Sequence, residues 1–220
     1  MSNPKMRTAI LISGRGSNMT AILEAARNKD YPAEIALVLA NNADAKGLET
    51  AAAEGIATAV VDHRPFKGDR EAFDAEIQSV LEANGIELVV LAGFMRILTP
   101  GFVDKWRDRM LNIHPSLLPS FKGLHTHQRA IDTGCRLAGC TVHFVRADMD
   151  SGPIITQAAV PVLDDDDEDS LSARILVMEH KVYPRAVALV AGGRTRVEGM
   201  RVIIAQTDED SQSPSRFLFH

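Results

Sequence analysis

The chain has few cysteines and no long apolar run, and these two absences exclude several classes of protein. Its only cysteines among 220 residues, Cys135 and Cys140, form a C-x4-C pair with no second pair to complete a zinc site. Two cysteines also cannot supply a disulfide framework, so we expect free thiols. The apolar run at 8–12 is too short for a signal peptide or a membrane span. We therefore predict a cytoplasmic protein with no membrane partner.

An excess of positive charge is also absent. The chain has 24 Lys and Arg against 29 Asp and Glu, which gives a formal net charge of −5. A broad nucleic-acid surface needs clustered, excess Lys and Arg. We therefore expect small-molecule partners and no nucleic acid, with any anionic ligand held by local features of the fold.

The first half of the chain alternates short apolar runs with amphipathic segments. The pattern predicts strands at 8–12, 34–39, 57–61 and 88–92, and helices at 17–29, 44–54 and 70–84. The run at 88–92 has almost no polar residue, which is typical of the centre of a parallel sheet. Such alternation indicates an α/β fold with a doubly wound, mostly parallel central sheet.

The pattern changes after residue 110. We predict strands at 110–113, 139–145 and 154–160, a short helix at 125–132, and a strand or hairpin at 196–204. A long helix is expected at 170–190, capped by Asp169 or Ser170, and Pro184 should kink or break it. The C-terminal part would thus add antiparallel strands and a long helix, and the polar tail at 206–220 should be mobile.

Residues 112–119, Asn-Ile-His-Pro-Ser-Leu-Leu-Pro, are the most informative stretch of the sequence. Asn112 and His114 are two positions apart on an extended segment, so their side chains project to one side. An amide N–H and a ring proton can then reach a single reacting oxygen. The alternative is a strand end whose polar groups only satisfy the local backbone.

Two aspartates lie further along, in the loop Asp148-Met149-Asp150-Ser151-Gly152-Pro153. A loop carboxylate is usually only solvated. If one of these carboxylates lay against His114, it would favour the protonated, acid-competent imidazole. Asp148 and Asp150 have the same chemistry, so residue type alone does not choose between them.

A glycine-rich loop, Ser13-Gly14-Arg15-Gly16-Ser17-Asn18, follows the first predicted strand and precedes the first helix. Glycines allow close backbone approach, and a helix N-terminus offers unpaired N–H groups to a phosphate. The loop meets neither the P-loop pattern nor the dinucleotide pattern, so a monophosphate fits it better. The alternative is a tight turn with Ser17 as helix N-cap.

Other polar residues have no assigned role. His125 and His127 form an H-x-H pair without a third ligand at useful spacing, so we predict no metal site. His143 lies in an alternating strand and could face either the core or a site. Arg96 stands among apolar residues at 94–98, after the strand end where open α/β sheets bind ligands.

Taken together, these motifs resemble those of the folate-dependent formyltransferases, over about residues 7–195 and in the same order. The resemblance implies a Rossmann-like formyltransferase fold and one domain at 1–205. Its phosphate-binding half would cover about 7–108, and its folate and catalytic half about 109–205.

The implied reaction moves the formyl group of 10-formyltetrahydrofolate to the amino group of phosphoribosylglycinamide, in purine biosynthesis. Folate is then a cosubstrate, and no cofactor is tightly bound. The oligomeric state, monomer or homodimer, stays open.

The resemblance also implies site residues. Asn112, His114 and Asp150 match the catalytic positions, and Gly16, Ser17, Asn18 and Glu179 match those that bind phosphoribosylglycinamide. The implied folate-binding positions are Arg70, Met95, Arg96, Ile97, Leu98, Asn112 and Val145.

Three rival functions remain. A formyltetrahydrofolate deformylase and a methionyl-tRNA formyltransferase would share the Asn–His–Asp trio. The Gly-Arg-Gly-Ser-Asn loop favours a phosphorylated acceptor, and the acidic net charge disfavours tRNA. A catalytically silent nucleotide-binding module is the third rival, and it requires that Asn112, His114 and Asp150 do not converge.

Overall fold

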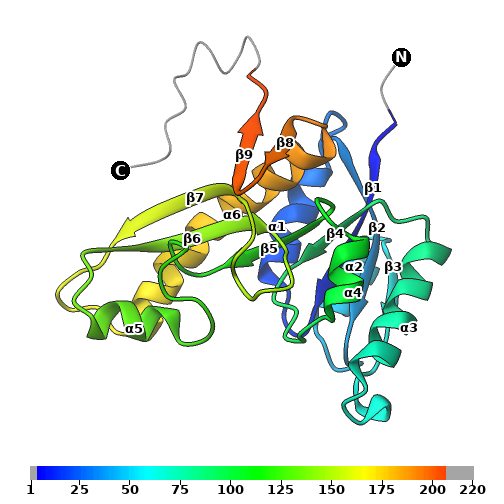
Figure 1. Cartoon of the computed structure of the whole chain (residues 1–220), viewed down its shortest axis with the longest axis horizontal. Helices are drawn as coiled ribbons and strands as arrows, with labels where there is room; N and C mark the ends of the chain where they lie inside the picture. The colour runs from blue at the N-terminus through cyan, green and yellow to red at the C-terminus, as the bar shows by residue number, and fades with distance from the viewer. Residues whose placement is uncertain (1–3, 207–220) are drawn as a thin grey trace.

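The computed structural model describes residues 4–206, and the strands in this range form one continuous sheet (Figure 1). The sheet order is β3-β2-β1-β4-β5-β6-β7-β9-β8. The strands are β1 (Met6–Ile12), β2 (Ala33–Ala40), β3 (Ala57–Val60), β4 (Leu88–Leu91), β5 (Met110–His114), β6 (Leu137–Phe144), β7 (Ile154–Pro161), β8 (Thr195–Glu198) and β9 (Arg201–Ile204).

The sheet is parallel from β3 to β5 and then changes direction. β6 pairs with β5 antiparallel, β7 pairs with β6 antiparallel, and the β8–β9 hairpin attaches to β7. The prediction of a doubly wound, mostly parallel sheet with antiparallel C-terminal strands is confirmed. The sheet runs without interruption through both halves of the chain expected from the sequence.

Helices cover both faces of this sheet. They are α1 (Ser17–Ala26), α2 (Gly47–Ala53), α3 (Arg70–Ala83), α4 (Pro100–Lys105), α5 (Thr126–Asp132) and α6 (Glu168–Ala191), with a 3-10 turn η1 (Arg64–Phe66). α1 and α6 pack on one core cluster, whereas α3 and α4 pack on another across the sheet. Because α4 has only six residues, sequence periodicity did not predict it.

Alternation along the strands explains the two cores. In β1, Ile10 and Ile12 face the α1 and α6 side, while Ala9 and Leu11 face the α3 side. Full burial of such a side chain contributes about 1.5–3 kcal/mol. The sheet therefore needs apolar residues at nearly every central position, as its sequence has.

α6 is the long helix that crosses the sheet, and two details of it differ from expectation. Its N-cap is Asp167, which forms a capping box with Ser170, so the prediction of Asp169 or Ser170 as the cap was wrong. The helix also continues through Pro184 as one element, so no break occurs there.

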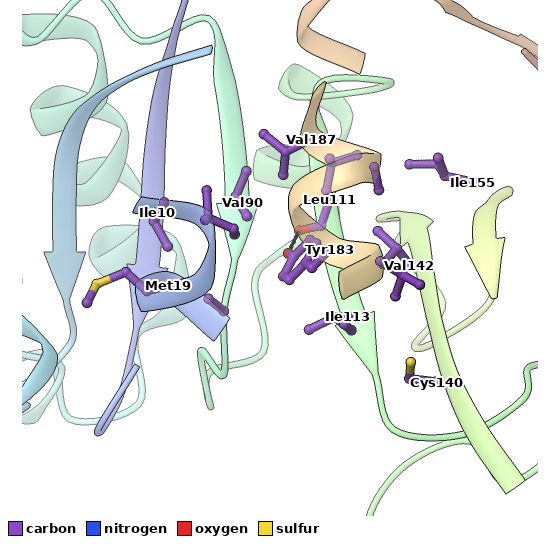
Figure 2. Packing of buried hydrophobic residues seen from close by; sticks show 14 of the residues in the cluster. Ile10, Met19, Val90, Leu111, Ile113, Cys140, Val142, Ile155, Tyr183 and Val187 are labelled. Atoms are coloured by element: carbon purple, nitrogen blue, oxygen red, sulfur yellow. Dashed lines mark hydrogen bonds between the residues drawn. The ribbon is translucent and has the colours of Figure 1, made fainter. Parts of the chain in front are cut away.

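The side chain of Tyr183 on α6 is fully buried beneath the central strands, close to Leu111 (Figure 2). Its hydroxyl donates to the carbonyl oxygens of Leu91 at 2.8 Å and Leu111 at 3.3 Å. α6 is thus fixed to the C-terminal end of β4 and to the start of β5.

The predicted tail at 206–220 lies almost wholly outside the described residues. Within the described part of the chain, no helix has the length and apolar character to cross a membrane. Cys135 and Cys140 are both free thiols, as expected, and burial raises the pKa of Cys140 to about 12.

Candidate active site

The C-terminal ends of β1, β4 and β5 meet at one edge of the sheet, where parallel α/β folds collect ligand-binding loops. Three segments start there: the glycine-rich loop after β1, residues 93–98 after β4, and the prolines after His114. This common edge is the reason that residues far apart in sequence form one site.

Asn112 and His114 lie on β5 with Ile113 between them, so strand alternation points both polar side chains to the same side. His114 is only 6% exposed. Pro115 follows at once and ends the strand, since proline has no N–H for a sheet ladder. The chain thus turns away directly beyond His114.

Asp150 reaches His114 from the loop between β6 and β7. Its Oδ2 lies 3.4 Å from His114 Nδ1, and both side chains are 8% exposed. The same Oδ2 accepts a hydrogen bond from the Gly123 N–H at 2.9 Å. Asp148 is exposed instead. The structure therefore brings Asn112, His114 and Asp150 together and leaves Asp148 in solvent.

The other ring nitrogen of His114 also has a partner. Nε2 lies 3.0 Å from the carbonyl oxygen of Phe121. A carbonyl and a carboxylate only accept hydrogen bonds, so His114 has an acceptor beside each of its two ring nitrogens.

The glycine-rich loop leads directly into α1. Gly16 is the N-cap with φ +71°, a left-handed conformation suited to glycine, and no side chain caps the helix. The alternative in which Ser17 is the N-cap is therefore wrong, because Ser17 is the first helical residue and is exposed. The first N–H groups of α1 therefore have no side-chain partner at this end of the helix, as an anion site requires.

Asn18 links this loop to α6. Its Nδ2 donates to Glu179 Oε2 at 2.7 Å, and Glu179 is 7% exposed. Burial raises the pKa of Glu179, and the Asn18 hydrogen bond partly opposes that rise. The buried Asn18 Oδ1 has no partner within the described residues. A polar ligand here would find both a carboxylate and an amide oxygen.

A cavity of about 410 Å³ opens beside residues 95–97. Of the predicted folate-binding residues, Arg70, Met95, Arg96 and Ile97 line it, together with His63 and Phe66. Arg96 is exposed and donates from Nε to the Met95 carbonyl at 2.8 Å. Two guanidinium groups at an open, partly apolar cavity suit an extended aromatic ligand that ends in carboxylates.

Three predicted folate-binding residues do not line this cavity. Leu98 is buried in the core cluster under α3 and α4, and Val145 packs against the same cluster. Asn112 lies beside His114 instead. Leu98 and Val145 therefore belong to or pack on the core and do not line the cavity.

Ser13 joins the two candidate binding regions. Its Oγ accepts a hydrogen bond from the Met95 N–H at 2.7 Å and donates to Asn41 Oδ1 at 2.5 Å. Asn41 is 3% exposed, so this link is anchored in the protein. The glycine-rich loop and the cavity wall are thus built as one unit, a contact that the sequence gives no signal for.

His125, His127 and His143, which had no role assigned from the sequence, lie at three different places in the fold. His125 is the N-cap of α5 at φ +56°, and His127, on α5, lines a second cavity of about 100 Å³. Burial lowers the pKa of His127. His143 is 2% exposed on β6, and its Nε2 lies 3.3 Å from Asn112 Nδ2. Within residues 4–206, no group of three His, Cys, Asp or Glu side chains is arranged to hold a metal ion.

Comparison with known proteins gives consistent matches. A family model described as "Formyl transferase" matches residues 6–187. The trifunctional purine biosynthetic protein adenosine-3 of Homo sapiens is 49% identical over 193 residues, 88% of this chain and 19% of the relative. The phosphoribosylglycinamide formyltransferase of Escherichia coli (strain K12) is 45% identical over 192 residues, 87% of this chain and 90% of that protein.

A solved structure agrees with these sequence matches. The crystal structure of glycinamide ribonucleotide transformylase 1 from Symbiobacterium toebii has a TM-score of 0.88 at 46% identity, covering 92% of this chain and 95% of that one. The chain therefore spans about a fifth of the trifunctional relative and about nine tenths of the bacterial one.

Proposed function

Because this chain belongs to the formyl transferase family, whose model matches residues 6–187, we propose that it transfers the formyl group of 10-formyltetrahydrofolate to the amino group of phosphoribosylglycinamide. The products are formylglycinamide ribonucleotide and tetrahydrofolate, in purine biosynthesis. One observation carries the proposal: Asn112, His114 and Asp150 converge, with Asp150 Oδ2 3.4 Å from His114 Nδ1. That convergence also argues against a catalytically silent nucleotide-binding module.

The acceptor is assigned to the glycine-rich loop and α6. Its phosphate lies against Gly16, Ser17 and Asn18, where helix N–H groups and a hydroxyl offer donors. The buried Glu179 carboxylate, 2.7 Å from Asn18, accepts from the ribose hydroxyls. Hydrogen-bond donors thus bind the phosphate group, and a hydrogen-bond acceptor binds the sugar hydroxyls.

The folate is assigned to the cavity beside residues 95–97. Met95 and Ile97 are 61% and 62% exposed, which gives an aromatic ligand apolar surface to cover. Arg70 and Arg96 pair with the carboxylates of the folate tail. The Ser13 contact to Met95 places this wall next to the acceptor loop, so the two substrates meet near His114.

The chemistry divides between Asn112 and His114. The acceptor amine attacks the formyl carbon, a C–N bond forms, and negative charge develops on the formyl oxygen. The Asn112 amide N–H and a ring N–H of His114 stabilise that charge, an effect of about 10²–10³ in rate per donor. When the bond from carbon to N10 breaks, N10 gains a proton and the attacking nitrogen loses one.

His114 is the acid for N10, either directly or through a water molecule. Its Nε2 lies 3.0 Å from the Phe121 carbonyl oxygen. When Nε2 donates its proton to the substrate, a contact with the substrate replaces this one. Asp150 contacts the opposite edge of the ring during this exchange, which keeps the imidazole oriented. Asp150 thus acts on the reaction through His114.

The setting of the reaction follows from the same properties. We propose a cytoplasmic enzyme that acts on small molecules without nucleic acid, supported by its two free thiols and net charge of −5. Folate serves as a cosubstrate that leaves after each turnover, so no tightly bound cofactor is needed. Either a monomer or a homodimer is compatible with one complete site per chain.

The test uses purified protein with 10-formyltetrahydrofolate, following tetrahydrofolate absorbance with and without phosphoribosylglycinamide. We expect product only when the acceptor is present. Folate turnover without the acceptor would indicate hydrolysis and favour a deformylase. No turnover under either condition would refute the proposal.

A further inference from the structure

His143 is a buried histidine beside the catalytic side chains that the mechanism above does not use. It lies on β6 directly opposite Asn112 on β5, as cross-strand partners in the antiparallel ladder. Such partners project to the same side of a sheet. Its side chain is 3% exposed, so its ring nitrogens find their partners within the protein.

The two ring nitrogens have different partners, and these partners decide where the proton lies. Nδ1 is 2.9 Å from the Phe144 carbonyl oxygen, which only accepts hydrogen bonds. Burial lowers the pKa of His143, so the ring is neutral at pH 7 and carries a single proton. That proton is therefore on Nδ1, and Nε2 is left with a lone pair.

This lone pair faces the amide of Asn112. Nε2 lies 3.3 Å from Asn112 Nδ2, so the amide donates one of its two N–H bonds to the ring. If the amide were reversed, its oxygen would face the Nε2 lone pair, and two acceptors would meet in a buried place. The neutral ring thus selects one orientation of the amide.

We propose that His143 is a positioning residue that orients Asn112, so that the second N–H of this amide points to the formyl oxygen. The inference rests on the proposed formyl transfer. The orientation set by His143 makes Asn112 a hydrogen-bond donor to the oxyanion, because the amide oxygen then points away from the oxyanion. His143 acts through Asn112 and needs no contact with either substrate.

The neutral state of His143 also protects the His114–Asp150 pair. The charged and titratable groups that face His143 are Asp150 and Arg146 from the loop after β6 and His114 from β5. Asp150 Oδ1 is 4.0 Å from His143 Nε2, too far for a hydrogen bond. A protonated His143 would compete for Asp150 and would present an N–H to the donor side of Asn112.

Two substitutions of similar shape separate positioning from packing. Gln can place an amide oxygen near the position of Nε2, whereas Asn reaches only the position of Nδ1. We expect His143→Asn to lower kcat about 100-fold with both KM values nearly unchanged, and His143→Gln to lose less than about 10-fold. Val142→Ala, a core substitution on the same strand, should lower Tm without lowering kcat.

A double variant gives a stricter test. In an Asn112→Ala background, where no amide remains to be oriented, His143→Asn should lower kcat by less than about twofold more. Equal losses for His143→Asn and His143→Gln, wild-type kcat in His143→Asn, or a full further loss in the double variant would each overturn the proposal.

A measurement on the wild-type protein needs no activity. The protein labelled with ¹⁵N-histidine should show one neutral ring at pH 7 that is protonated at Nδ1, assigned to His143 because the signal is lost in His143→Gln. If the variant does not fold, assignment by a through-bond experiment on wild type replaces it. A charged ring or an Nε2-protonated ring would overturn the inference, whereas absent formyl transfer with this tautomer present would refute only the proposed function.

Discussion

Substitution of Gly152 should displace the proposed catalytic side chains without changing any residue that is proposed to contact a substrate. A Cβ atom on Gly152 would lie 1.7 Å from the Phe144 carbonyl oxygen and 3.2 Å from Arg146 Cγ. Cβ contacts below 3.0 Å are essentially never found in proteins, so the two backbones must separate by about 1.3 Å. The chain cannot avoid this movement, because the Phe144 oxygen is a backbone atom and the backbone of residue 152 fixes the position of its Cβ.

The movement reaches two parts of the site. The Phe144 carbonyl accepts the proton of His143 Nδ1, and Gly152 is two residues from Asp150. A misplacement of about 1 Å in a catalytic group can lower a rate about 10²-fold. We therefore expect Gly152→Ala to lower kcat about 100-fold, equivalent to about 2.7 kcal/mol in the barrier.

Loss of stability alone would not explain such a result. Overpacking of this kind costs about 1–3 kcal/mol of the free energy of unfolding, out of a typical 5–15 kcal/mol. Most of the protein would stay folded at 25 °C, and Tm would fall by about 2–4 °C for each kcal/mol. A drop in kcat at 25 °C therefore reports misplacement of the catalytic group.

The assay compares kcat and Tm of Gly152→Ala with those of Gly101→Ala. A Cβ on Gly101, in α4, would have no atom within 4 Å, so kcat should not change and stability should stay equal or rise slightly. Wild-type kcat and Tm in Gly152→Ala would refute the reasoning, since the close contact would then have been relieved at no cost.

Three further substitutions test the roles of individual side chains. His114→Ala should lower kcat by orders of magnitude while Tm and acceptor binding change little, and near-normal turnover would remove His114 from the mechanism. Ser17→Asp places a carboxylate at the expected phosphate position, so KM for the acceptor should rise far more than KM for folate; equal effects on both substrates would contradict a phosphate site there. Asp150→Asn removes the carboxylate that lies 3.4 Å from His114 Nδ1, so kcat should fall strongly, whereas Asp148→Asn in solvent should change kcat little. Identical losses from the two aspartate variants would show that the wrong carboxylate was chosen.

Much of the fold could be predicted from the sequence because its signals are local. The apolar runs at 8–12 and 88–92 correspond to β1 and β4, and the periodicity at 70–84 corresponds to α3. α4 was missed because six residues carry too little periodicity. The cap at Asp167 was missed because any of the acidic residues before α6 satisfies the same rule.

From residue patterns alone, the site was predictable only where one element contains it, and the grouping of Asp150 with His114 came from the family resemblance. Asn112 and His114 lie on a single strand, so their common direction follows from alternation. The pairing of His143 with Asn112 depends on the register of β5 against β6, and the contact of Ser13 with Met95 depends on the order of β1 and β4 in the sheet. Neither register nor sheet order is visible in local sequence patterns, so these contacts required the structure.

The hydrogen bond between Asn18 and Glu179 has a consequence for synthesis of the protein on the ribosome. The two residues are 161 positions apart. At a translation rate of about 5–20 residues per second, Asn18 exists for about 8–32 s before Glu179 is made. The glycine-rich loop is therefore exposed on the nascent chain, without its partner on α6, through most of elongation. Chains that end before α6 therefore lack Glu179, which is one half of the proposed acceptor site.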